Sequence, residues 1–271
     1  MQKETGYLPK KYNIKSVKEM TSDVKLLRVS SKINPLPGQF IEVSIPGIGE
    51  CPLASCSFNK DYIDILLRNA GNTTSEIFKL KAGDKIYIRG PYGKGFPLET
   101  CGKDILLAAG GTGIAPVTSF IEYIEKNRKK FGKITIYFGF RNKDYILLKD
   151  KISMWKKKFN IRLTLDQKSP GYLNGFINQL IEKDHPNVEN SVAFICGPEI
   201  MMKAITKSLN SLGMKNNKIF WSMERRMECG FGNCGRCTIQ DVYVCENGPV
   251  FRYDFIKPRI ENEEHANEVK E

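Results

Sequence analysis

The feature that most constrains this chain is a group of four cysteines close together near its C-terminal end. They follow the spacing C-x4-C-x2-C-x7-C, and we expect three thiolates from one tight loop and the fourth from a strand that follows it. Gly230, Gly232 and Gly235 allow the backbone of such a loop to fold closely around a metal centre and to turn N–H groups toward the sulfurs. The predicted ligands, within MECGFGNCGRCTIQDVYVC, are Cys229, Cys234, Cys237 and Cys245.

This spacing is typical of a plant-type [2Fe-2S] cluster, in which C-x4-C-x2-C is followed by a more distant cysteine. Arg225, Arg226 and Arg236 would offset the negative charge of a cluster held by four thiolates. A structural zinc site with four cysteine ligands is the alternative, and such sites often pair their cysteines through C-x2-C. Because this segment has one such pair and is rich in glycine, we predict a [2Fe-2S] cluster.

The positions of the other cysteines argue against a disulfide framework. The chain has eight cysteines, of which four are crowded together and the rest are scattered. Such crowding suits metal ligation in a reducing compartment. We therefore interpret Cys51, Cys56 and Cys101 as structural thiols.

Composition predicts a soluble, cytoplasmic protein. No stretch approaches the roughly 18 apolar residues of a membrane span, and the opening MQKETGYLPKK lacks the apolar centre of a secretory signal. The net charge of +12 comes mostly from lysines spread along the chain, whereas nucleic-acid binding favours a compact basic stripe with interleaved aromatics. We expect no membrane and no nucleic acid as partner, and a basic face suits an acidic redox partner.

The N-terminal part of the sequence predicts a small antiparallel β-barrel. Short strand-forming segments alternate with turns such as PGQ, PGIGE and GPYGKG. The expected strands are residues 12–20, 24–30, 39–45, 62–69 and 84–90.

From about residue 103 the pattern changes to apolar runs that alternate with longer helical stretches. The runs ILLAAGG, ITIYFGF, IRLTLDQ and VAFICGP are separated by segments such as FIEYIEKNRKKF and followed by EIMMKAITKSLNSLG. This alternation is typical of a parallel βαβ sheet.

These patterns predict a chain of the β plus α/β class, with an antiparallel β-barrel domain, a parallel-sheet nucleotide domain and a small cysteine-bearing domain. The charged tail PRIENEEHANEVKE is predicted to be disordered or to lie on a neighbouring molecule. The predicted boundaries are residues 6–99, 102–222, 223–257 and, for the tail, 258–271.

A glycine-rich turn between a predicted strand and helix is the second candidate site. In ILLAAGGTGIAPVTSF the glycines allow backbone amides to approach a pyrophosphate, and the helix N-terminus favours its negative charge. A plain tight turn is the alternative, because the spacing is not G-x-G-x-x-G. A CGP segment ends another strand at the same carboxyl edge, where open α/β sheets bind ligands. The predicted nucleotide contacts are Gly110, Gly111, Thr112, Gly113, Ile114, Ala115, Pro116, Cys196, Gly197 and Pro198.

The order of barrel, GGTGIAP and CGP resembles the ferredoxin-NADP reductase superfamily. The ending ERRMECGFGNCGRC with YVCENGPVF resembles three kinds of electron-transfer subunit, those of dihydroorotate dehydrogenase type B, of sulfhydrogenase (gamma) and of anaerobic sulfite reductase. The resemblance covers residues from about 6 to 255. The N-terminal extension and PGQFIEVSIPGIGECPLAS are most similar to the sulfite reductase and sulfhydrogenase proteins, and the short link TIQDVYV favours sulfite reductase.

The resemblance implies an FAD site in the barrel, although one flavin motif is eroded. The family's R-x-Y-S/T falls on PLAS, which keeps the serine and lacks the arginine and tyrosine. The second element is better kept, because Arg68 and the hydroxyls and amides after it suit a phosphate. The alternative for Arg68 is a surface residue of the barrel. The residues assigned to the flavin are Cys51, Pro52, Leu53, Ala54, Ser55, Leu67, Arg68, Asn69, Gly71, Thr73, Thr74 and Ser75.

Chemistry gives an independent argument for flavin. A nicotinamide releases two electrons as a hydride, whereas a [2Fe-2S] cluster accepts one electron at a time, and a flavin exchanges electrons with both. We therefore expect an enzyme subunit that passes electrons from NADH through FAD and the cluster to a partner. The resemblance implies iron–sulfur and sirohaem subunits as partners in a hetero-oligomer that reduces sulfite to sulfide.

Two alternatives remain. One is an electron-transfer subunit of dihydroorotate dehydrogenase B or of a sulfhydrogenase that delivers electrons to NAD(P). The other is a non-catalytic, zinc-stabilised interaction module. The choice between NADH and NADPH also stays open, because Arg141 after the second sheet strand suits either a 2′-phosphate or solvent.

Overall fold

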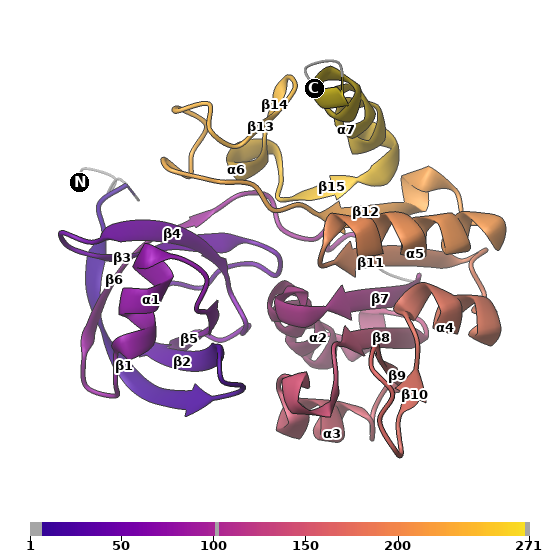
Figure 1. The fold of residues 1–271 in the computed structure, drawn as a ribbon, viewed down its shortest axis with the longest axis horizontal. Coiled ribbons are helices and arrows are strands. Elements are labelled where there is room, and N and C mark those ends of the chain that lie inside the picture. Colours follow the sequence, from indigo (N-terminus) through magenta and orange to yellow (C-terminus); the bar gives the residue numbers. More distant parts are fainter. Residues whose placement is uncertain (1–6, 101–102, 269–271) are drawn as a thin grey trace.

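The computed structural model describes residues 7–100 and 103–268. Figure 1 shows an N-terminal β-barrel beside a larger sheet flanked by helices, with a C-terminal lobe above that sheet. The predicted fold class is confirmed. Cys101, interpreted as a structural thiol, lies outside the described residues.

The barrel is a six-stranded sheet in the order β4-β3-β6-β1-β2-β5, and all its pairings are antiparallel. A bridge between Ser55 and Ile65 joins the segment after β4 to β5, which closes the sheet. Inward-facing residues such as Leu27, Ile41 and Ile88 are fully buried. The elements are β1 (Lys10–Glu19), β2 (Val24–Ser30), β3 (Phe40–Ile45), β4 (Gly49–Ala54), β5 (Tyr62–Arg68), α1 (Asn72–Lys79) and β6 (Lys85–Tyr92).

The five predicted barrel strands are present, and the sequence pattern missed two elements. β4 contains a glycine and a proline, and both residue types are uncommon in strands. It pairs with β3 on one side, so an edge position accommodates Pro52. Helix α1 has a single fully buried residue, Ile77, which leaves little apolar periodicity to detect.

The second sheet has seven strands in the order β10-β9-β8-β7-β11-β12-β15, all parallel except β15. Parallel strands buried on both faces read as continuous apolar runs, which is why the sequence revealed them. The strands are β7 (Asp104–Gly110), β8 (Ile134–Phe140), β9 (Asn160–Leu165), β10 (Leu173–Asn174), β11 (Ser191–Cys196), β12 (Ile219–Ser222) and β15 (Val250–Arg252).

Helices cover both faces of this sheet. Phe120 of α2 and Trp155 of α3 pack in one apolar cluster, and Leu180 of α4 and Met202 of α5 pack in another. Alternate residues of the central strands contribute to the two clusters. No helix in the described part of the chain is long and apolar enough to cross a membrane. The helices are α2 (Ile114–Lys126), α3 (Lys149–Trp155), α4 (Ile177–Asp184) and α5 (Glu199–Ser211), with 3-10 turns η1 (Gly111–Gly113), η2 (Arg128–Lys130), η3 (Lys143–Tyr145) and η4 (Asn216–Lys218).

The C-terminal lobe corrects two predictions. Cys245 lies in a short helix rather than in a strand, because the strand before it ends at Tyr243. Tail residues 258–268 are not disordered but belong to a helix, which is anchored by the buried Ile256 and Ile260, four residues apart. The elements of this lobe are β13 (Thr238–Ile239), β14 (Val242–Tyr243), α6 (Val244–Asn247) and α7 (Tyr253–Glu268).

Candidate functional site

The glycine-rich turn lies where β7 passes into α2, at the carboxyl edge of the parallel sheet. Gly111 has a φ of +54°, a conformation that glycine adopts readily. A Cβ on Gly113 would lie 2.5 Å from the carbonyl oxygen of Cys196, so only glycine allows this approach. The structure therefore brings the GGTG turn and the CGP segment together.

A cavity of about 460 Å³ opens at this edge. Gly110, Gly111 and Pro198 line it together with Arg141 and Asp166, which follow β8 and β9. Burial raises the pKa of Asp166. A pyrophosphate in this cavity would meet backbone amides at the start of α2. Ile114, by contrast, is fully buried in the core under the turn.

A second cleft, of about 300 Å³, lies between the barrel and the nucleotide domain. It gathers residues from three segments that are far apart in the sequence, as a cofactor site between two domains requires. The barrel supplies Pro52, Leu53, Ala54, Arg68 and Thr74; the nucleotide domain supplies Thr112, Ala115, Pro116 and Cys196; and the segment after β12 supplies Ser222, Met223, Glu224, Arg225 and Met227.

Several residues assigned to the flavin do not line this cleft. Ser55 is fully buried and its hydroxyl donates to the carbonyl of Ser57, 2.8 Å away. The Ser75 hydroxyl donates to Asn69 Oδ1. Leu67 points into the barrel core, since side chains alternate across a strand. The others outside the cleft lining are Cys51, Asn69, Gly71 and Thr73.

The second flavin element predicted from the sequence lies partly at the cleft. Thr74 lies in the first turn of α1, and its hydroxyl accepts hydrogen bonds from the N–H groups of Ala70 and Gly71. Arg68 lines the cleft while its Nε donates to Asp23 at 3.1 Å. A guanidinium and a helix N-terminus therefore flank the same end of the cleft, which suits an anionic group.

The segment between β12 and the cysteine loop contributes cleft residues that, apart from Arg225, the sequence did not single out. Desolvation raises the pKa of Glu224. Burial, with the nearby charge of Glu224, raises the pKa of the Cys196 thiol to about 12. Arg225, expected to balance cluster charge, pairs instead with Glu263 of α7 at 2.9 Å. In the sequence, the only indication that this segment lines a cofactor site was its position immediately before the cysteine loop.

The cysteine loop presents several backbone N–H groups to sulfur. The N–H of Asn233 donates to Cys229 Sγ at 3.2 Å, and the N–H of Gly232 donates to Cys245 Sγ at 3.1 Å. The glycines make this possible, because Gly230 and Gly232 have φ values of +81° and +78°. Hydrogen bonds of this kind stabilise thiolates that bind iron.

These contacts change the pKa of the cysteines in opposite directions. Partial burial by itself would raise the pKa of Cys229, but backbone hydrogen bonds, including one from Phe231, outweigh it and lower the pKa to about 7. Burial and the neighbouring Cys237 raise the pKa of Cys245 to about 12. Iron bound to the sulfur would remove that proton, because metal ligands are deprotonated.

The thiols influence one another in two pairs. Cys234 helps to lower the pKa of Cys229, and Cys237 helps to raise the pKa of Cys245. Within the described ranges, no three His, Cys, Asp or Glu side chains gather as ligands of one ion. Zinc needs four sulfurs around a single point, whereas a [2Fe-2S] cluster has two irons with two cysteines each.

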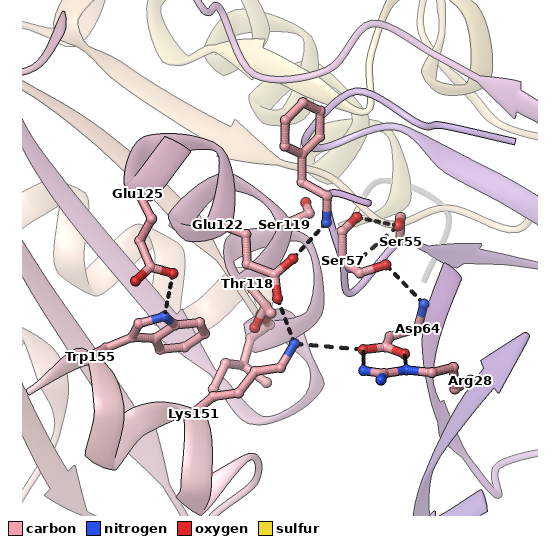
Figure 2. A network of polar contacts seen from close by, with 12 residues as sticks. Arg28, Ser55, Ser57, Asp64, Thr118, Ser119, Glu122, Glu125, Lys151 and Trp155 are labelled. Atoms are coloured by element: carbon pink, nitrogen blue, oxygen red, sulfur yellow. Dashed lines mark hydrogen bonds and ion pairs between the residues drawn. The ribbon is translucent and has the colours of Figure 1, made fainter. Parts of the chain in front are cut away.

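A network of ion pairs and hydrogen bonds joins the barrel to the nucleotide domain (Figure 2). Arg28 and Asp64 of the barrel form a bidentate pair at 2.7 and 2.9 Å. Lys151 of α3 lies 2.7 Å from Glu122 of α2, and Glu122 accepts the N–H of Phe58 at 2.7 Å. These contacts connect the barrel directly to α2 and α3 of the nucleotide domain.

Comparisons with known proteins agree with this architecture. Residues 107–207 match the oxidoreductase NAD-binding domain family, and residues 224–257 match the iron–sulfur cluster binding domain of dihydroorotate dehydrogenase B. The chain is 38% identical to sulfhydrogenase 1 subunit gamma of Pyrococcus furiosus, over 80% of this chain and 79% of that protein. It is 37% identical to a probable dihydroorotate dehydrogenase B (NAD(+)) electron transfer subunit of Thermococcus kodakarensis, over 88% and 94%.

Among solved structures, an NADH-dependent reduced ferredoxin-NADP oxidoreductase described for flavin-based electron bifurcation superposes with a TM-score of 0.77. It covers 93% of each chain at 24% identity, which shows the shared fold. The chain belongs to the family of NAD-dependent flavin and iron–sulfur electron-transfer subunits that includes sulfhydrogenase gamma subunits and the electron transfer subunits of dihydroorotate dehydrogenase B.

Proposed function

We propose that this chain transfers electrons between NADH at the GGTG edge and a partner protein, through FAD in the interdomain cleft and a [2Fe-2S] cluster on the four cysteines. The observation that carries this proposal is the composition of the cleft. Thr112 and Cys196 of the nucleotide domain face Ala54 of the barrel, and Met227 continues directly into the cysteine loop. The cleft is therefore lined by residues that adjoin both the GGTG turn and the cysteine loop in the sequence.

The residues around the cleft hold and orient the reacting groups. In this proposal, the Gly113 turn and the CGP segment, which approach each other closely, would hold the nicotinamide end of the nucleotide. Arg68 and the first turn of α1 balance the flavin phosphates. When bound, FAD supplies the exchange between hydride and single-electron chemistry. Ala54, Leu53 and Pro52 form an apolar wall that excludes water from the transfer.

Asp166 favours NADH over NADPH in this proposal. Its carboxylate lines the nucleotide cavity beside Arg141. A carboxylate accepts hydrogen bonds from a free ribose hydroxyl and repels a 2′-phosphate. Arg141 alone would favour the phosphate, so the pair decides the preference.

The terminal reaction belongs to the partner subunits. The sequence motifs favour a sulfite-reducing complex with iron–sulfur and sirohaem subunits. A second candidate, oxidation of dihydroorotate or hydrogen with delivery of electrons to NAD(P), is supported by relatives whose names carry those activities. In each case the cysteine loop is the point where electrons pass to or from the partner.

The test is purification of the full chain under anaerobic conditions, followed by iron, sulfide, zinc and flavin analysis and by NADH reduction. We expect stoichiometric FAD, two irons per chain and bleaching of the cluster spectrum by NADH. A colourless protein that contains zinc would support the interaction-module alternative. Isolation of the native complex and assay with sulfite, dihydroorotate or hydrogen then separates the terminal reactions.

A further inference from the structure

Arg89 of β6 links the barrel to the cysteine loop through its guanidinium group. The side chain is 7% exposed. Its Nε donates to both carboxylate oxygens of Glu50 at 2.9 Å, and its Nη1 donates to the hydroxyl of Tyr92 at 3.2 Å. Its Nη2 also donates to Glu50 Oε1. Two further bonds reach across to the loop, where Nη2 donates to the Glu228 carbonyl at 2.9 Å and Nη1 donates to the Cys229 carbonyl.

These contacts use a property that only arginine has. Its planar group presents five N–H donors in a fixed fork, so one side chain bridges a carboxylate and two carbonyls that point in different directions. A lysine at this position would supply one point charge and fewer directed bonds. The carbonyl of Cys229 belongs to a cluster ligand, so the position of Arg89 is transmitted directly to the first thiolate.

The loop also packs closely on the barrel beside this arginine. Gly230 has a φ of +81°, and a Cβ there would lie 3.1 Å from Glu42 Oε1 and 3.2 Å from the ring of Tyr92. Glu42 is 1% exposed, and in the described part of the chain its Oε1 is the buried side-chain atom that has no hydrogen-bond partner. Burial, with the nearby charge of Glu50, raises the pKa of Glu42 to about 8.

The charge of Arg89 is balanced on the barrel side of its contact with the cysteine loop. Glu50 is the carboxylate that pairs directly with the Arg89 guanidinium, so it offsets the charge of Arg89. The guanidinium lies directly against the ligand Cys229. A positive charge in a poorly solvated position interacts strongly with a centre that gains negative charge.

We propose that Arg89 is a positioning residue for electron transfer, which fixes the cysteine loop on the flavin barrel and favours the reduced form of the cluster. The step is the movement of one electron from the flavin to the cluster, with no bond made or broken. NADH is the reductant. The flavin-to-cluster part of this inference rests on the proposed function, whereas the effect on the cluster itself does not.

The experiment compares Arg89→Gln, Arg89→Lys and Glu50→Gln in the full chain, purified anaerobically with its cofactors. Dithionite titration followed by electron paramagnetic resonance gives the reduction potential and the spectrum of the cluster without NADH. We expect Arg89→Gln to lower the potential and alter the spectrum, Arg89→Lys to restore part of both, and Glu50→Gln to raise the potential. The opposite signs follow from removing a positive and a negative charge beside the same centre.

Stopped-flow reduction by NADH separates the two electron-transfer steps. We expect Arg89→Gln to leave flavin reduction unchanged and to slow the following cluster reduction by about tenfold, since small displacements of reacting groups have effects of this size or more. Failure of NADH to reduce the wild-type cluster would contradict the proposed function alone, because the dithionite titration would still test Arg89.

Arg162→Gln is the matched control. Arg162 also forms a bidentate pair, with Asp184 at 2.7 Å for both bonds, but both of these residues belong to the nucleotide domain. Its substitution should lower stability and leave the cluster potential and spectrum unchanged. The inference is overturned if Arg89→Gln and Glu50→Gln keep the wild-type potential and spectrum, or if Arg162→Gln changes them equally. If Arg89→Gln does not fold, Glu50→Gln decides, because it keeps the arginine.

Discussion

Lys151 of α3 lies 3.7 Å from the carboxylate of Asp64, a fully buried residue of β5, and this ion pair crosses from the nucleotide domain to the barrel. Figure 2 shows Lys151 between Asp64 and Glu122, with Arg28 on the far side of Asp64. Two poorly exposed carboxylates thus share one lysine. Loss of the Lys151 ammonium would leave the charges of Asp64 and Glu122 less well compensated. An uncompensated charge is costly in a poorly solvated position.

Substitution of Lys151 by methionine should destabilise the protein by about 2 kcal/mol, in the range for a hydrogen bond to a charged group. It should also slow hydride transfer from NADH, because the two domains are no longer held at a fixed separation. Thermal unfolding and stopped-flow flavin reduction measure the two effects. Lys158→Met is the control, since Lys158 pairs with Glu125 at 2.7 Å within the nucleotide domain and is exposed. For Lys158→Met we expect the free energy of unfolding to change by no more than about 0.5 kcal/mol. Equal losses of stability in the two variants would contradict the role of Lys151.

Gly113→Ala should impair the use of NADH. The added Cβ would meet the carbonyl oxygen of Cys196 at 2.5 Å, so the GGTG turn and the CGP segment must move apart. We expect kcat/KM for NADH to fall at least about tenfold. Cluster reduction by dithionite serves as the internal control and should be unchanged. A wild-type kcat/KM would show that this close approach is not needed.

Asp166→Ser should shift coenzyme preference toward NADPH. The substitution removes the carboxylate from the cavity and leaves Arg141 in place. We expect the ratio of kcat/KM for NADPH over NADH to rise at least about tenfold. The 2′-phosphate of NADPH would no longer be repelled by the carboxylate of Asp166 and could pair with Arg141. Steady-state kinetics with both nucleotides measure the ratio. An unchanged ratio would place the ribose away from Asp166.

Glu42→Gln should remove part of the pH dependence of stability. The pKa of Glu42 is raised from 4.5 to about 8 in the folded protein, so the native state binds more protons than the unfolded state between these values. The free energy of unfolding of the wild type therefore falls as the pH rises across this window. Glutamine resembles the neutral acid and does not ionise. We expect the difference in melting temperature between the variant and the wild type to grow in favour of the variant as the pH rises from 4.5 to about 8. Parallel plots of melting temperature against pH for the two proteins would contradict the raised pKa of Glu42.

The sequence predicted the elements whose signal is local. The strands of the parallel sheet appear as continuous apolar runs because helices cover both of its faces. Glycines at the GGTG turn mark a close backbone approach, and the cysteine spacing marks a chelating loop. The helix α7 was missed because its polar composition hides the two isoleucines that bury it. Cys245 was placed in a strand because nothing between Tyr243 and the cysteine signals the short helix.

The cleft residues were harder to predict, because they come from segments distant in the sequence. Glu224, Arg68 and Thr112 meet only once the barrel, the nucleotide sheet and the C-terminal lobe have packed together. The same holds for Arg89, whose sequence context gives no sign that it contacts Cys229. The PLAS segment shows the reverse case, since its three apolar residues reach the cleft while the retained Ser55 turns into the interior.

By itself the sequence determined the class of each domain and the thiolates available for a cluster, because periodicity and chelate spacing are properties of short stretches of chain. The tertiary structure alone decided how the loop of Cys229 is seated on the barrel, how Lys151 joins the domains and which side chains face the cleft. Those arrangements depend on buried charges that find partners only across domain boundaries, and residue spacing does not encode such long-range pairing.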